Sequence, residues 1–253
     1  MSSDVLLVNG FEGFVMKWLL ISSAVLYLAS FKRPVFLAAL AAGLVYLGSR
    51  GLALGRLPLI GPQDTLAFFS SSIGLMALPF VYARAAANER FFTWGTGVFA
   101  GLFALLATPF PTLNMPLPPV LDTYWFELHV ALAFFAYALF GIAALFGVVF
   151  LMQGKRQVLD LQYRAALVGY TFFSLSMISG GIWGYYAWGT YWLWTAKEFW
   201  TSILWVYYSL YLHLRLKGQS WDRGFAWMGI VGFFVTLFTY LGVSLLMRSS
   251  HSF

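Results

Sequence analysis

The feature that most constrains the fold is a series of apolar stretches, each long enough to cross a lipid bilayer. A membrane-spanning helix needs about 20 predominantly apolar residues, and the chain contains eight such stretches joined by short links. Their apolar residues are continuous rather than alternating, which argues against the strands of a membrane β-barrel. The expected spans are residues 13–31, 34–54, 64–84, 91–108, 125–152, 165–187, 197–214 and 224–247.

The composition agrees with a membrane location. Hydrophobic residues make up 61% of the chain and charged residues only 9%, proportions far from those of a soluble domain. The sequence therefore predicts an all-α, polytopic membrane bundle of about eight transmembrane helices, with residues 1–253 forming a single transmembrane domain. Residues 13–31 are expected to be a retained helix, because the segment before them lacks the basic leader of a signal peptide.

The distribution of basic residues predicts how the bundle is oriented. Ten lysines and arginines lie beside the links that follow the first, third, fifth and seventh spans, and the opposite links carry few. Because basic residues concentrate on the cytoplasmic side, we expect this set inside and both termini outside. The net charge of +6 mostly reflects these residues and requires no nucleic acid. The ten are Lys32, Arg33, Arg84, Arg90, Lys155, Arg156, Arg164, Arg215, Lys217 and Arg223.

One outer link is exceptionally rich in tryptophan. Six tryptophans fall between Trp183 and Trp205, together with the charged pair Lys197 and Glu198. Indole offers a broad apolar face and one N–H donor, so this segment can line a flat aromatic ligand. The alternative is an aromatic belt at the membrane surface, although a belt scatters its residues among many helices. The charged pair could open the next helix, where Glu198 suits the positive end, or serve the ligand.

The three histidines are the candidate metal ligands. His129 and His251 are expected on the outer face beside the tryptophan segment. Two imidazoles can occupy both axial positions of haem iron, so the sequence suggests a haem held between them above residues 188–200. For either histidine alone, an interfacial side chain is the alternative. His213 lies deep in the seventh span; it is either a second ligand site completed by another chain or a histidine at the cytoplasmic interface beside Arg215.

The order of residues in the tryptophan segment resembles a known signature. The run is Trp188-Gly189-Thr-Tyr-Trp192-Leu-Trp194-Thr-Ala-Lys197-Glu198-Phe-Trp200. It resembles the WWD signature of the haem-handling protein superfamily. Its Lys-Glu-x-Trp ending is similar to that of the CcsA (ResC-like) family, the cytochrome c synthase component of the system II maturation pathway. Thr195 stands where the signature has an aspartate.

The resemblance extends from about residue 58 to the end of the chain. Leu128-His129-Val130 is similar to the region of the family's first external histidine, and His251 follows a closing helix similar to the one before the second. Ser244 replaces the asparagine that is usual in that helix. His213 matches the histidine of the helix after the signature.

The resemblance implies transport and presentation of haem b. In the family, haem passes from the cytoplasmic side, where a histidine of the partner CcsB completes the site, to the outer face. There the thiols of the Cys-x-x-Cys-His motif of apocytochrome c add to its vinyl groups. The implied iron ligands are His129, His251 and His213, of which the first two are also the implied catalytic residues. The implied haem-binding residues are Trp188, Gly189, Trp192, Trp194, Lys197, Glu198, Trp200 and His213.

The expected partners are therefore a CcsB-like membrane protein, apocytochrome c and the lipid bilayer. The expected location is the bacterial inner membrane, with the thylakoid membrane as the alternative because the family occurs in both. Two other functions stay open. The chain could carry haem without attaching it, which Thr195 makes more plausible, or it could be a non-catalytic membrane subunit that retains the fold.

Overall fold

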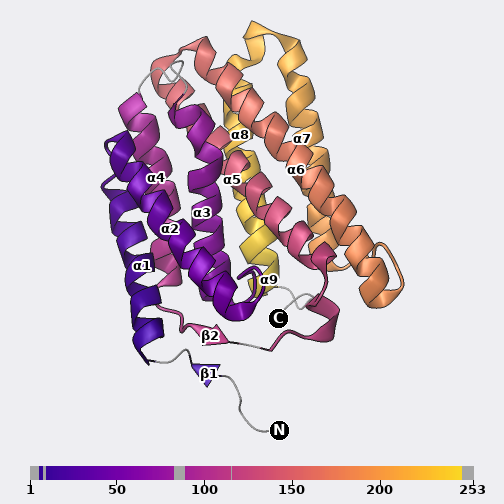
Figure 1. Ribbon diagram of the computed structural model, residues 1–253. Helices are drawn as coiled ribbons and strands as arrows, with labels where there is room; N and C mark the ends of the chain where they lie inside the picture. Colours follow the sequence, from indigo (N-terminus) through magenta and orange to yellow (C-terminus); the bar gives the residue numbers. More distant parts are fainter. Residues whose placement is uncertain (1–5, 8–9, 83–88, 115, 247–253) are drawn as a thin grey trace. The chain divides into compact units, whose positions relative to one another are not determined.

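The structure, a computed structural model, describes residues 6–7, 10–82, 89–114 and 116–246 (Figure 1). Nearly all of these residues are helical, and the described part contains eight long helices. These are α1 (Gly10–Leu28), α2 (Arg33–Leu54), α3 (Pro62–Val81), α4 (Glu89–Ala107), α5 (Tyr124–Gln153), α6 (Arg156–Trp188), α7 (Ala196–Leu214) and α8 (Asp222–Leu237). The short elements are β1 (Leu6–Leu7), β2 (Leu113–Asn114), η1 (Pro119–Leu121), η2 (Arg215–Lys217), η3 (Gln219–Trp221), the π-helical η4 (Phe238–Gly242) and α9 (Val243–Leu246).

The predicted all-α, multi-pass membrane bundle is confirmed. Six described helices are long and apolar enough to cross a membrane, namely α2 to α6 and the continuous segment Gln219–Gly242 around α8. Two helices of 19 residues, α1 and α7, are not among these six. Helix α7 contains two tryptophans and three tyrosines, whose polar groups suit an interface. That α1 and α7 span the membrane stays a prediction.

The sixth helix begins earlier than the sequence suggested. Its expected start was residue 165, but α6 begins at Arg156. The added turns carry charged residues that the apolar count excluded, and two of these are held by ion pairs. Arg156 Nε lies 2.8 Å from Asp222 Oδ2, and Asp160 pairs with Arg215. Charge marks where the bilayer ends, but it does not end a helix.

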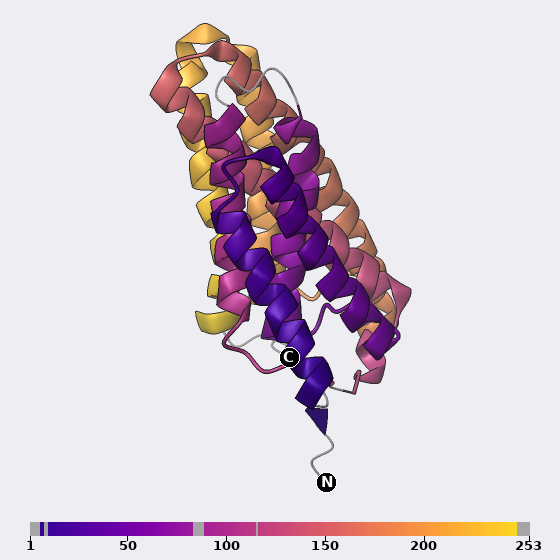
Figure 2. The ribbon, with the colours of Figure 1, turned by 60° about the vertical axis from the view of Figure 1, so that its left-hand side comes forward.

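The chain divides into two compact units, one containing α1 to α4 and the other containing α5 to α9. In the first unit the helices alternate in direction (Figure 1, Figure 2). In the second, α5 packs along α6 and α8, and α7 packs against α6 and α8. Phe140 of α5 stacks on Tyr208 of α7 with ring centroids 3.6 Å apart. A single transmembrane domain across the whole chain stays a prediction.

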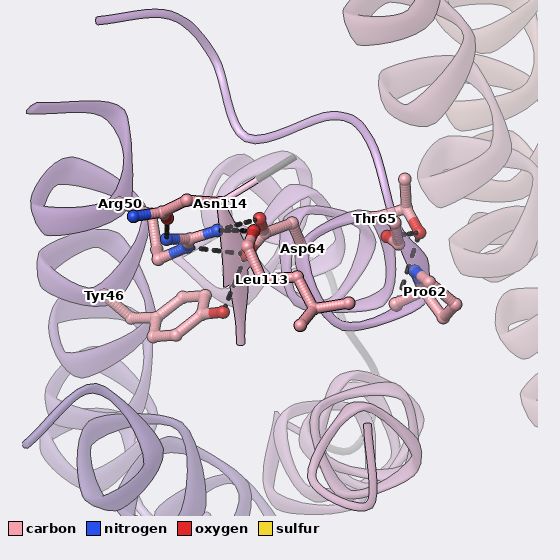
Figure 3. A network of polar contacts seen from close by, with 8 residues as sticks. Tyr46, Arg50, Pro62, Asp64, Thr65, Leu113 and Asn114 are labelled. Atoms are coloured by element: carbon pink, nitrogen blue, oxygen red, sulfur yellow. Dashed lines mark hydrogen bonds and ion pairs between the residues drawn. The ribbon is translucent and has the colours of Figure 1, made fainter. Parts of the chain in front are cut away.

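A buried ion pair organises one end of the first unit (Figure 3). Arg50 of α2 is fully buried, and its Nε and Nη2 atoms donate to the two carboxylate oxygens of Asp64 of α3 at 3.0 and 2.7 Å. Tyr46 also donates to Asp64, at 2.8 Å. The guanidinium further donates to the side chain of Asn114 and the carbonyl of Leu113 in β2, which pairs antiparallel with β1. Arg50 is thus a structural anchor rather than a flanking surface charge.

Ion pairs gather the charges at one end of the second unit. Arg156, at the start of α6, pairs with Asp222, at the start of α8. Arg215, which follows α7, pairs with Asp160 of α6 and lies 3.6 Å from Asp222. The basic residues of the α5–α6 and α7–α8 links therefore share one end of this unit, as the charge distribution predicts. Which side of the membrane this end faces stays a prediction.

Candidate functional site

A hollow in the second unit brings together α5, α6, the link after α6, and the first turns of α7. Its volume is about 150 Å³, and most of its wall is apolar and aromatic. The charged side chains at its wall are Lys197 and Glu198. The lining residues are Phe126, His129, Val130, Tyr137, Phe173, Ser176, Met177, Gly180, Trp183, Gly184, Trp188, Trp192, Lys197, Glu198 and Thr201.

His129 enters this wall from the second turn of α5 and lies against α6. Its Nδ1 is 2.7 Å from the carbonyl oxygen of Ser176 and 3.1 Å from the Ser176 hydroxyl. The same hydroxyl donates to the His129 carbonyl at 2.9 Å. The imidazole is stacked with Trp183, with ring centroids 6.1 Å apart and an interplanar angle of 21°. The ring is thus held in one orientation at the wall of the hollow.

Trp183 lines the hollow, although the sequence reasoning placed it only in the tryptophan-rich segment and not among the individual haem-binding residues. It is 4% exposed and packs between Phe126, at 5.2 Å, and Trp188, at 4.9 Å between ring centroids. The spacing of residues in this part of α6 could have indicated that Trp183 belongs to the site. Ser176, Gly180 and Trp183 are four and three residues apart, which places them on one face of a helix. That face is the one that meets His129.

The link from α6 to α7 contains two residues in the left-handed backbone conformation. Gly189 follows the last residue of α6 with φ of 74°, and its N–H donates to the Tyr185 carbonyl at 2.9 Å. This conformation suits glycine at a helix C-terminus. Trp194 has φ of 56°, which in a residue other than glycine costs about 1–3 kcal/mol. The strain must be balanced by contacts elsewhere in the link.

A capping box at the start of α7 supplies those contacts. Thr195 is the N-cap residue, and its hydroxyl accepts from the N–H of Glu198 at 3.4 Å. Glu198 Oε2 accepts from the N–H groups of Leu193 and Thr195, both at 2.9 Å. Aspartate and threonine both cap helix N-termini. Thr195 can therefore serve the same capping role as the aspartate that usually occupies its position.

Substitutions of Thr195 test whether this position requires only a capping oxygen or also a negative charge. We expect Thr195→Val to destabilise the start of α7 by about 1 kcal/mol, and Thr195→Asp to be tolerated. The melting temperature in detergent and tryptophan fluorescence measure the effect. Thr171→Val is the matched control, because the Thr171 hydroxyl bonds the Leu167 carbonyl within α6. Wild-type stability and fluorescence in Thr195→Val would contradict the capping role.

The hollow does not include every predicted site residue. Trp194 is 70% exposed and contacts Trp192 edge to face at 6.4 Å. Trp200 packs edge to face against Phe238 of η4 at 4.7 Å, and Gly189 is the residue that follows α6. The predicted residues that do line the hollow are His129, Trp188, Trp192, Lys197 and Glu198.

The other two histidines lie elsewhere. His213 is exposed in the last turn of α7, with its Nδ1 2.7 Å from the Ser209 carbonyl. It is 17 residues from the start of the helix (196 to 213), roughly 25 Å at 1.5 Å per residue. The two predicted haem sites therefore lie at opposite ends of α7. His251 lies outside the described residues.

The fold and this hollow define a multi-pass, all-α membrane protein with a histidine set among tryptophans. Comparison with known proteins gives the family: residues 11–251 match the model of the cytochrome c assembly protein family. The chain belongs to that family. The sequence-based resemblance to CcsA is thereby confirmed, since several cytochrome c biogenesis proteins CcsA are its relatives.

Three relatives illustrate the similarity. CcsA of Chlamydomonas reinhardtii is 30% identical over 221 residues, which cover 79% of this chain and 61% of the relative. CcsA of Trieres chinensis is 27% identical over 82% of this chain and 81% of the relative. CcsA of Prochlorococcus marinus (strain MIT 9515) is 32% identical over 56% of this chain and 57% of the relative. The chain thus spans between about half and four fifths of these relatives.

A solved structure shares the fold. The cytochrome c haem lyase CcmF superimposes with a TM-score of 0.73 and covers 99% of this chain. Only 49% of the CcmF chain is matched, at 14% sequence identity. The match establishes that the helical arrangement occurs in a protein of known structure.

Proposed function

We propose that the protein acts in cytochrome c maturation, by holding haem as its substrate and presenting it to apocytochrome c for covalent attachment. The observation that carries this proposal is the position of His129 in a hollow walled by Trp183, Trp188 and Trp192. Membership of the cytochrome c assembly family and the CcsA relatives support it. The proposed location of this multi-pass membrane protein is the bacterial inner membrane, with a thylakoid membrane as the alternative.

The chemistry of the lining fits a haem. Aromatic faces suit the macrocycle, imidazole is an axial ligand for iron, and Lys197 supplies a positive charge for a propionate. The volume of about 150 Å³ is below the range of roughly 300–1,000 Å³ that encloses a drug-sized ligand. A macrocycle would therefore be only partly enclosed. We infer that one edge stays outside, where a second protein can reach it.

The remaining predicted residues take different roles in this proposal. Glu198 acts by holding the link, because its carboxylate accepts from two backbone N–H groups. His251, which lies outside the described residues, is proposed as the second axial ligand of haem b. His213, at the other end of α7, is proposed to meet haem on the cytoplasmic side together with a CcsB-like partner.

The attachment itself requires little from this chain besides positioning. Each cysteine thiol of the apocytochrome adds across a vinyl double bond, so that a C–S bond forms and the proton goes to the other vinyl carbon. No oxidant is consumed. The chain has no cysteine, so it contains no thiol that could compete with the apocytochrome for the vinyl groups. Holding the reacting groups in place is a major source of rate acceleration in such reactions.

Co-expression tests the proposal. The chain is produced with a CcsB-like membrane protein and a reporter apocytochrome, and the reporter is denatured and examined for covalently bound haem. We expect attachment with all three proteins and none when this chain is omitted. Haem bound to the chain without attachment would instead support the carrier alternative. A chain with no Soret absorption in any combination would contradict the proposed haem binding.

A further inference from the structure

We propose that Ser176 and Gly180 are positioning residues, which fix the tautomer and the orientation of the His129 imidazole so that Nε2 is the nitrogen presented to iron. The inference rests on the proposed function in one respect, the identity of the metal. The geometry of the ring against α6 is independent of it.

The tautomer follows from the two contacts of Nδ1. A carbonyl oxygen can only accept, so the Ser176 carbonyl 2.7 Å away requires that Nδ1 carries the proton. The Ser176 hydroxyl has a single proton, which it donates to the His129 carbonyl. Toward Nδ1, 3.1 Å away, this hydroxyl therefore presents a lone pair. Both contacts assign the proton to Nδ1, and the lone pair of the neutral ring is then on Nε2.

The orientation depends on the absence of a side chain at position 180. A Cβ atom built on Gly180 would lie 2.5 Å from His129 Nδ1 and 2.7 Å from Cε1, closer than real Cβ contacts. Glycine within a helix costs about 1 kcal/mol relative to alanine, so its presence in α6 needs a compensating reason. The close approach of the imidazole supplies that reason.

The arrangement has the chemical form of a metal-ligand support. Ligating histidines usually donate their second ring N–H to a carbonyl or carboxylate, which fixes the ring and makes the ligating nitrogen more basic. Loss of such a support typically lowers metal affinity by about 10–100-fold. Ser176 is 1% exposed and Trp183 is 4% exposed, so water does not readily replace the Ser176 contacts.

The tautomer can be measured without haem. In full-length protein labelled with 15N-histidine, the nitrogen shifts distinguish a ring protonated at Nδ1 from one protonated at Nε2, and His129→Gln identifies the signal. We expect the Nδ1–H form in the wild type and a mixture of forms in Gly180→Ala. A wild-type ring protonated at Nε2 would overturn the inference.

Haem titration of variants provides the second measurement. We expect Gly180→Ala to lower haem affinity by about 10–100-fold and to shift the Soret band, because the axial imidazole is displaced. Ser176→Ala removes the hydroxyl contacts but keeps the Ser176 carbonyl, so it should shift the same band in the same direction by a smaller amount. Ser176→Thr, which keeps the hydroxyl, should behave like the wild type. Gly181→Ala is the matched control, since its nearest contact would be the Tyr191 carbonyl at 3.4 Å.

The outcomes separate this inference from the proposed function. If the wild type binds haem and both Gly180→Ala and Ser176→Ala behave like Gly181→Ala, the positioning role is wrong and the function stands. If the wild type neither binds nor attaches haem, the function is wrong, and the 15N spectrum still decides the positioning of the ring. If Gly180→Ala does not fold, Ser176→Ala and the wild-type spectrum remain decisive.

Discussion

His129→Ala is expected to abolish stable haem binding and, with it, covalent attachment to a co-expressed apocytochrome. The substitution removes the imidazole that lines the aromatic hollow, whereas the loss of a supporting contact alone costs about 10–100-fold in metal affinity. The loss of the ligand should therefore exceed that range. Soret absorption of the purified protein and covalent haem on the denatured reporter measure the two effects.

The control for this substitution is Tyr186, an aromatic residue in the last turn of α6, the helix that packs against His129. Tyr186 is 70% exposed and does not line the hollow, so Tyr186→Ala should retain the wild-type spectrum. A His129→Ala protein that folds and shows the wild-type Soret band would show that His129 is not an iron ligand. Loss of haem in both variants would indicate a general disturbance of the α6 end.

Asp64→Ala is expected to lower the free energy of unfolding by about 3–5 kcal/mol, because it leaves the guanidinium of Arg50 buried without its carboxylate. Arg50 is fully buried and Asp64 is 4% exposed, so water cannot readily replace the lost partner. The same change should loosen β2, which Arg50 also bonds. Thermal unfolding in detergent measures the effect.

A double variant distinguishes the burial of an unpaired charge from the loss of a useful contact. Replacing a buried ion pair by apolar residues of similar volume is often close to neutral, so Arg50→Met combined with Asp64→Leu should be more stable than Asp64→Ala. Recovery should be incomplete, because the double variant also removes the partners of Tyr46 and Asn114. Ser49→Ala on α2 is the control, since its hydroxyl donates to the Val45 carbonyl in the same helix. Equal stability of Asp64→Ala and wild type would contradict this account of the ion pair.

Several features could be predicted from the sequence because they depend on neighbouring residues. The length of each apolar run indicated the long helices, since a span is defined by the thickness of the bilayer. A start of α7 near Lys197 and Glu198 was one of the two possibilities that the sequence offered for this pair, because a carboxylate suits the positive end of a helix. The charge distribution likewise grouped the links that share ion pairs at one end of the second unit.

The identity of the residues that line the hollow was harder to predict from the sequence. Trp200 belongs to the same signature as Trp188 and Trp192, yet it turns toward Phe238, because successive positions on a helix point in different directions. Trp183 lies in the hollow although it precedes the signature. A list of tryptophans cannot distinguish these cases. The rotation of each helix and the path of the link between α6 and α7 decide them.

The sequence by itself determined that this chain is a helical membrane protein of the cytochrome c assembly family, since apolar length and a local signature are written in consecutive residues. Only the tertiary structure decided that Gly180 admits the His129 ring, that Ser176 orients it, and that Arg50 is joined to Asp64. Those contacts link residues that are 14 to 51 positions apart. They exist because separate helices pack at a particular rotation and depth, which local propensity does not specify.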